Sequence, residues 1–118
     1  MTGRTPLDPA TAMGPMIDAE QCRTVADYVK VGSEEGAQIV FGGRQVMEET
    51  GGHYFQPSIL AGVDNAMRIA QEEIFGPVLS IIPYEDDDDA VRIANDSLYG
   101  LAGGVWSADD ERAMSVAR

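Results

Sequence analysis

The chain has 118 residues, a length typical of one domain or of part of a larger one. Hydrophobic residues make up 44% and charged residues 24%, a composition that indicates a folded protein rather than a disordered one. The net charge of -12 disfavours nucleic acid, and the sequence has no basic cluster for an anionic membrane. A single cysteine excludes an internal disulfide and any multi-cysteine metal site. Without an apolar run of membrane-spanning or signal-peptide type, a cytoplasmic, soluble protein is expected.

The first third of the chain predicts a loop followed by an amphipathic helix. Prolines and glycines interrupt every periodic pattern in residues 1–15, which are therefore expected to be loop. A helix is predicted from about Ala19, with Asp18 as its cap and Gln21 at the position that completes a capping box. Gly36 is the expected residue just past its end. The apolar stripe of this helix comprises Cys22, Val25, Ala26 and Val29.

Two extended segments are predicted after the helix. Residues 37–41 form a short apolar strand that a Gly-Gly pair closes, and residues 44–53 are expected to be an exposed polar excursion. Residues 54–60 are the second extended segment. Pro57 within it indicates an edge position or an irregular strand.

The second half predicts a parallel strand–helix–strand unit. Residues 77–83 are almost continuously apolar, as in a strand of a parallel sheet covered on both faces. A helix that ends at Gly100 follows, and residues 102–107 are the expected next strand. The predicted fold class is α/β, with helices on the sheet faces. Residues 109–118 begin a further helix with an apolar stripe, and little sequence remains to cover it, so we expect a segment of a larger protein.

Three candidates for chemistry each have a simpler structural explanation. Cys22 lies on the apolar stripe of the first helix and is expected to be an unreactive core residue. The lone histidine, His53, follows a Gly-Gly pair without a ligand pattern and is expected to be a solvated turn residue. The acidic run at residues 85–89 lacks the alternation and central glycine of a calcium loop, and its expected role is to cap a helix. No catalytic or metal-binding residue is assigned.

One segment suggests part of a cofactor site. No glycine motif for a dinucleotide pyrophosphate is present, so any cofactor contact made by this chain must be partial. In Q-E-E-I-F-G-P-V, residues 71–78, a Gly-Pro break leaves Glu73 and Phe75 on a bend. A carboxylate there could accept hydrogen bonds from two vicinal hydroxyls, and the aromatic ring could pack on a planar heterocycle. From chemistry alone, an exposed glutamate and a core phenylalanine are the simpler expectation.

Several ordered motifs resemble the aldehyde dehydrogenase superfamily. Residues 72–78 resemble its E-E-I-F-G-P-V signature, residues 8–17 its D-P-x-T-x-x-G-P-L-I segment, and residues 94–101 its A-N-x-x-x-Y-G-L segment. The E-G-A at residues 35–37 and the Y-F-Q-P at residues 54–57 occur between them in the expected order.

The resemblance implies NAD(P)-dependent oxidation of an aldehyde to a carboxylic acid. In that reaction a cysteine thiolate attacks the aldehyde and hydride passes to the nicotinamide. The resemblance also implies that Glu73 holds the hydroxyls of the nicotinamide ribose and that Phe75 contacts the cofactor near the nicotinamide. Leu101 is a further candidate for that region. The partners it implies for the full enzyme are an aldehyde and further copies of the same chain.

The sequence departs from the family where the chemistry lies. The family's nucleophile and general-base glutamate precede the Asp-Pro segment and have no counterpart here, and Cys22 does not match the nucleophile position. The Rossmann-like cofactor domain and a C-terminal stretch are also missing. Residues 1–118 are therefore expected to be a partial catalytic domain, inactive in isolation. Two alternatives stay open, a non-catalytic interaction or oligomerisation module of the same fold and a regulatory binder of pyridine nucleotides.

Overall fold

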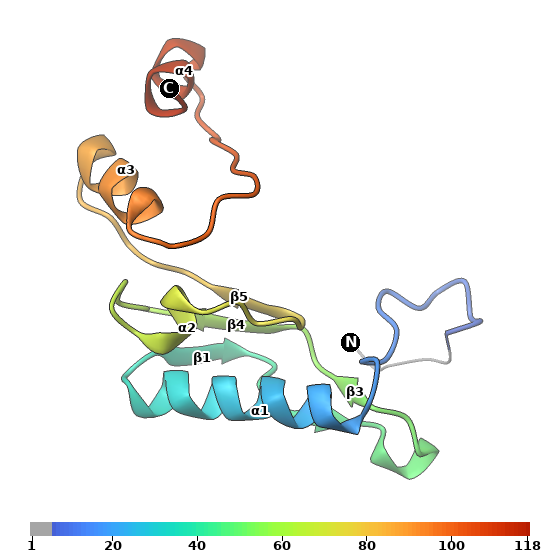
Figure 1. Ribbon diagram of the computed structural model, residues 1–118. Coiled ribbons are helices and arrows are strands. Elements are labelled where there is room, and N and C mark those ends of the chain that lie inside the picture. The colour runs from blue at the N-terminus through green and yellow to red at the C-terminus, as the bar shows by residue number, and fades with distance from the viewer. Residues whose placement is uncertain (1–5) are drawn as a thin grey trace. The chain divides into compact units, whose positions relative to one another are not determined.

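The computed structural model describes residues 6–118, which divide into two compact units, residues up to 83 and residues 84–118. Residues 6–15 form turns and loop as predicted, and residues 1–5 of that predicted loop lie outside the described part. The first unit contains two α-helices, five short strands and one 3-10 turn (Figure 1). In chain order these are α1 (Ala19–Glu34), β1 (Gln38–Phe41), β2 (Gln45–Val46), η1 (Glu48–Thr50), β3 (Tyr54–Phe55), β4 (Ser58–Ala61), α2 (Arg68–Gln71) and β5 (Val78–Ser80).

The ends of α1 follow the sequence signals. The Asp18 carboxylate accepts a hydrogen bond from the backbone N–H of Gln21 at 2.8 Å, which confirms the predicted cap. The other half of the predicted capping box is not formed, because the Gln21 side chain donates to the carbonyl of Phe75 instead. Gly36 has a φ of +112°, a conformation that disfavours residues with a side chain, and the prediction for the helix end is confirmed.

The main sheet has the order β1-β4-β5, with β1 antiparallel and β5 parallel to β4. Figure 1 shows α1 running along one side of this sheet. The parallel pair β4 and β5 is joined through α2, a helix that the sequence pattern did not predict. The α/β class is therefore correct, although the parallel connection uses different elements from those expected.

The predicted strand at residues 102–107 is wrong, since the structure has no strand there. A strand must pair its N–H and C=O groups with a neighbouring strand, and Trp106 in this segment is 91% exposed. β5 also occupies only Val78–Ser80 of the predicted residues 77–83. Pro77 has no N–H to donate, and just past the strand the N–H of Ile81 still donates to the carbonyl of Leu60 at 2.8 Å. Leu79 is 57% exposed, so this strand is not covered on both faces within the unit.

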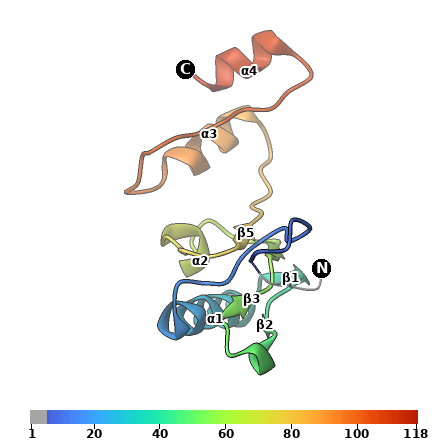
Figure 2. The same cartoon turned by 90° about the vertical axis from the view of Figure 1, so that its right-hand side faces the viewer.

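Residues 44–53 contain regular structure, whereas the sequence predicts an exposed polar excursion there. β2 and β3 pair as an antiparallel hairpin through Gln45↔Phe55 and Val46↔Tyr54, and η1 lies between them. Figures 1 and 2 both place this hairpin near the N-terminal end of α1. Between β3 and β4 the chain is irregular at Pro57, as predicted.

The core lies between α1 and the main sheet. Of the predicted stripe, Cys22, Val25 and Val29 are buried and Ala26 is partly buried. The remaining buried members of this core cluster come from β3, β4, α2 and the connections between elements, and are Ala37, Phe55, Leu60, Val63 and Ile69. The first unit therefore has a small hydrophobic core of its own.

The second unit consists of α3 (Asp87–Asn95) and α4 (Asp110–Val116), neither of which has a buried residue. The Asp86 carboxylate caps α3 by accepting from the N–H of Asp89 at 2.9 Å, which confirms the capping role of the acidic run. This helix ends at Asn95 and not near Gly100 as predicted. The Ser97 side chain forms a competing local hydrogen bond there, since its Oγ accepts from the N–H of Tyr99 at 3.1 Å.

A bidentate ion pair joins the helices of the second unit. Arg112 donates to the two carboxylate oxygens of Asp87 at 2.8 and 2.6 Å. These hydrogen bonds lower the pKa of Asp87. Among residues 6–118, no helix combines the length and hydrophobicity needed to cross a bilayer.

We expect truncation of a buried leucine to alanine to destabilise the first unit more than truncation of an exposed one. Leu60 is 0% exposed and Leu79 is 57% exposed in neighbouring strands. Leu60→Ala should lower the free energy of unfolding by about 2–5 kcal/mol, because a cavity adds to the lost burial. The matched Leu79→Ala change should cost less than about 1 kcal/mol. Urea unfolding measures both, and equal losses would contradict this description of the core.

Candidate functional site

Both predicted cofactor residues lie on the irregular loop between α2 and β5, residues 72–77, called here the 72–77 loop. Phe75 is 72% exposed, so the simpler expectation of a core phenylalanine is wrong. Glu73 is exposed as well. Within residues 6–118, no hydrogen bond or ion pair involves the Glu73 side chain. The loop therefore offers an available carboxylate and an aromatic ring two residues apart.

Alternate residues of the loop face the protein. Ile74 is partly buried and packs against the core cluster. Gly76 lies so close to α1 that a Cβ there would clash with Cγ2 of Val25. Only a glycine permits this approach without displacing the loop or the helix. Glu73 and Phe75 are thus exposed because their neighbours are held against the core.

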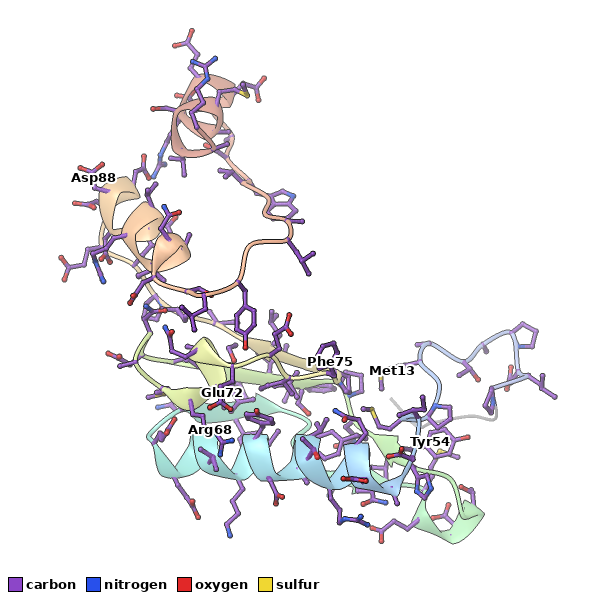
Figure 3. The ribbon with its side chains drawn as sticks, viewed as in Figure 1. Met13, Tyr54, Arg68, Glu72, Phe75 and Asp88 are labelled. Carbon is purple, nitrogen blue, oxygen red and sulfur yellow. The ribbon has the colours of Figure 1, made fainter. Side chains whose placement is uncertain are left out.

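At the start of the loop, Glu72 is bound by two side chains. Its Oε2 accepts from the Tyr28 hydroxyl at 2.6 Å and from Nε of Arg68 at 2.8 Å. The Arg68 guanidinium also lies 5.1 Å from the centroid of the Tyr28 ring, a cation–π contact. Figure 3 shows Arg68 and Glu72 together over α1, with Phe75 further toward the N-terminal end of that helix.

These contacts shift the pKa values of Glu72 and Tyr28. The hydrogen bond from Tyr28 and then that from Arg68 lower the pKa of Glu72, since both donors stabilise the carboxylate. The same hydrogen bond raises the pKa of Tyr28, because an ionised tyrosine could not donate to Glu72.

Near its other end, the loop is bound through its backbone. Nε2 of Gln21 donates to the carbonyl of Phe75 at 2.7 Å. Gln21, Val25 and Tyr28 stand at positions i, i+4 and i+7 of α1 and therefore lie along one face of the helix. This face contacts Phe75, Gly76 and Glu72 in turn. One side of α1 thus supports the whole loop.

Two other sequence candidates, Cys22 and His53, do not join this site. Cys22 is 1% exposed in the core, and burial, followed by the nearby charge of Glu48, raises the pKa of its thiol. His53 is partly buried, and its carbonyl accepts from the N–H of Met16 at 2.7 Å. Within the described part of the chain, no group of three or more His, Cys, Asp or Glu residues has a metal-binding arrangement. Leu101 is 95% exposed and belongs to the second unit.

Sequence reasoning missed the residues that hold the loop. Arg68 and Glu72 are four residues apart, a spacing that favours an ion pair on a helix. This contact could therefore have been predicted from the sequence. Tyr28 and Gln21 lie 44 and 54 residues from their partners in the loop, and no local pattern indicates either contact.

The arrangement is suited to binding rather than to bond breaking. An exposed carboxylate can accept two hydrogen bonds from a vicinal diol, and an exposed ring can pack on a flat heterocycle. The one thiol, Cys22, is buried and protonated by preference, which makes it a poor nucleophile.

Comparison with known proteins gives consistent matches over the whole chain. The family model described as "Aldehyde dehydrogenase family" matches residues 1–118. The geranial dehydrogenase of Castellaniella defragrans is 52% identical over 112 residues, which are 95% of this chain and 23% of that protein. This chain spans about a quarter of the length of the curated relatives that it matches.

Solved structures agree with the sequence relatives. The indole-3-acetaldehyde dehydrogenase of P. syringae, in complex with NAD+ and IAA, superposes with a TM-score of 0.94 at 50% identity over 98% of this chain and 23% of that chain. The Mycobacterium tuberculosis aldehyde dehydrogenase complexed with NAD+ gives 0.92 at 48% identity over 99% of this chain and 24% of that chain.

We expect the contribution of Glu72 to stability to depend on pH at both ends of the range. Its carboxylate has a lowered pKa, so its stabilisation is present above the ordinary value of 4.5 and is lost as the pH falls through the folded pKa. Tyr28 has a raised pKa, so its part is present below pH 10 and is lost as the pH rises through the folded value. Urea unfolding of wild type and Glu72→Gln should therefore differ most between about pH 5 and pH 9.

The control for this prediction is Glu49→Gln, which changes an exposed carboxylate of η1. Its unfolding free energy should follow that of the wild type across the series. A difference between wild type and Glu72→Gln that stays constant from acid to alkaline pH would contradict the assigned contacts.

Proposed function

The chain belongs to the aldehyde dehydrogenase family, and from this premise we propose that it is a catalytic-domain segment of an NAD(P)-dependent enzyme that oxidises an aldehyde to a carboxylic acid. Its contribution is the contact to the nicotinamide ribose of the cofactor. The observation that carries the proposal is the exposed Glu73 carboxylate, which has no partner among the described residues and stands on a loop held by α1.

The loop residues fit the part of the cofactor assigned to them. Glu73 supplies an acceptor for two ribose hydroxyls, and the ring of Phe75, 72% exposed, supplies an apolar surface for a flat heterocycle. NAD(P), when bound, takes up the hydride that leaves the aldehyde. The NAD+ complexes of the two related structures support this assignment.

The reactive thiol of the enzyme lies outside these 118 residues in this proposal. Burial of Cys22 supports this, because a thiolate is required for attack on an aldehyde. The exposure of Leu98, Leu101 and Trp106, each above nine-tenths, supports a role as one part of a larger catalytic domain. We also propose that the full enzyme is homo-oligomeric and cytoplasmic.

A non-catalytic interaction module is the second candidate. The row Phe41↔Ile59↔Leu79 crosses the three strands of the main sheet, and Phe41 and Leu79 are 45% and 57% exposed. Such a face favours contact with another protein surface.

We expect Glu73→Gln to weaken cofactor binding selectively. The test protein is a chimera in which this chain replaces the matching quarter of the geranial dehydrogenase. Loss of the charge-assisted hydrogen bonds should raise the Kd for NAD+ by about tenfold, or ~1.4 kcal/mol, and leave the KM for the aldehyde unchanged. Calorimetric titration and steady-state kinetics measure the two values.

The control for this experiment is Glu49→Gln, which removes the charge of another exposed glutamate. It should leave the Kd for NAD+ within twofold of the unsubstituted chimera. An unchanged Kd in Glu73→Gln would refute the ribose contact.

We expect the 118-residue chain alone to produce no NADH from an aldehyde and NAD+. Turnover that persists in Cys22→Ala would show that the chemistry was assigned to the wrong part of the protein, and turnover lost in that variant would identify Cys22 as the nucleophile.

Size-exclusion chromatography with light scattering on the same sample tests the second candidate. A stable, monodisperse oligomer would favour the interaction module.

A further inference from the structure

The two adjacent glutamates of the 72–77 loop have opposite surroundings. Glu72 accepts two hydrogen bonds, from Tyr28 at 2.6 Å and from Arg68 at 2.8 Å. No described residue donates to Glu73, which is exposed. A ligand that used Glu72 would have to displace two donors, one of them charged, and would gain little. Glu72 is therefore the fixed member of the pair and Glu73 the available one.

Fixing Glu72 also determines where Glu73 points. The backbone at Glu72 is extended, with φ -117° and ψ 148°, because α2 ends there. In an extended segment, successive side chains point to opposite sides. The burial pattern follows this alternation, since Ile74 packs against the core while Phe75 is exposed. A Glu72 side chain held toward α1 thus turns Glu73 away from that helix.

The Tyr28 hydroxyl connects α1 to the loop across 44 residues of sequence. Arg68 lies on α2, and its backbone N–H donates to the Glu35 carboxylate at 2.8 Å, which ties the start of α2 to the end of α1. Its guanidinium then contacts both the Tyr28 ring and Glu72. The Tyr28 hydroxyl is therefore held in place by neighbours on two helices.

We infer that Tyr28 is a positioning residue for the cofactor contact, which it orients by holding Glu72. The inference rests on the proposed function, because the contact it serves is that of Glu73 and Phe75 with NAD(P). Gln21 performs the same task near the other end of the loop, through the carbonyl of Phe75. Neither residue touches the ligand in this scheme.

Tyr28→Phe tests the inference, because it removes one hydroxyl and keeps the ring that Arg68 contacts. In the geranial dehydrogenase chimera, the Kd for NAD+ should rise about fivefold, or ~1 kcal/mol, and the KM for the aldehyde should stay the same. In a Glu72→Ala background the same substitution should have no further effect, because both changes break one contact. Tyr84→Phe removes a hydroxyl from an exposed tyrosine outside the loop and is the matched control.

A second measurement uses the 118-residue chain itself. The backbone N–H groups of Glu72 and Gly76 donate to the carbonyls of Arg68 at 3.0 Å and Ile74 at 2.8 Å. Hydrogen exchange at these two groups should become faster in Tyr28→Phe and in Gln21→Ala, and stay unchanged in Tyr84→Phe. Faster exchange in the first two variants alone would support the inference even if the chimera failed to fold.

The outcomes separate this inference from the function on which it rests. If Glu73→Gln weakens NAD+ binding and Tyr28→Phe does not, the positioning role is refuted and the ribose contact stands. If Tyr28→Phe lowers the melting temperature and leaves the Kd for NAD+ unchanged, Tyr28 is merely structural and the inference is also refuted. An unchanged Kd in Glu73→Gln would overturn both proposals.

Discussion

Close packing of α1 against the 72–77 loop is the constraint on which the rest of the first unit depends. One stripe of this helix, with Cys22 and Val29, enters the core, and a neighbouring stripe, with Gln21 and Tyr28, contacts the loop. Val25 belongs to both, because it is fully buried and limits residue 76 to glycine. The loop is irregular, yet its position is set by a rigid helix at three successive turns. Binding groups that are held by regular elements in this way need less ordering when a ligand arrives.

The acidity of the chain agrees with the proposed ribose contact. A net charge of -12 repels the phosphates of a dinucleotide, and neither unit has a glycine motif that could bind them at a helix start. Sugar hydroxyls are uncharged donors, and a carboxylate such as Glu73 is a suitable acceptor for them. Under the proposed function, this chain therefore serves the sugar of the cofactor and leaves its phosphates to other parts of the enzyme.

Local signals in the sequence were sufficient for local structure and failed where distant segments meet. The Asp18 cap, the stripe of Cys22 and Val25, and the turn at Gly36 each depend on residues a few positions apart, and all are confirmed. Residues 102–107 have the composition of a strand, but a strand also needs a partner, which composition does not specify. Gln21 was assigned to a capping box by its spacing, whereas its amide bonds to a carbonyl 54 residues away.

The family signature directed attention to Glu73 and Phe75, but the structure adds why those side chains are the accessible ones. The two units also differ in what stabilises them. The first has a core around Leu60 and Phe55, whereas the second has no buried residue in either helix and joins them through the Arg112–Asp87 ion pair. Exposed ion pairs contribute little to stability, so this pair cannot compensate for an absent core. The 84–118 unit therefore requires apolar cover from another surface in order to be stable, and the first unit, which carries the 72–77 loop, does not.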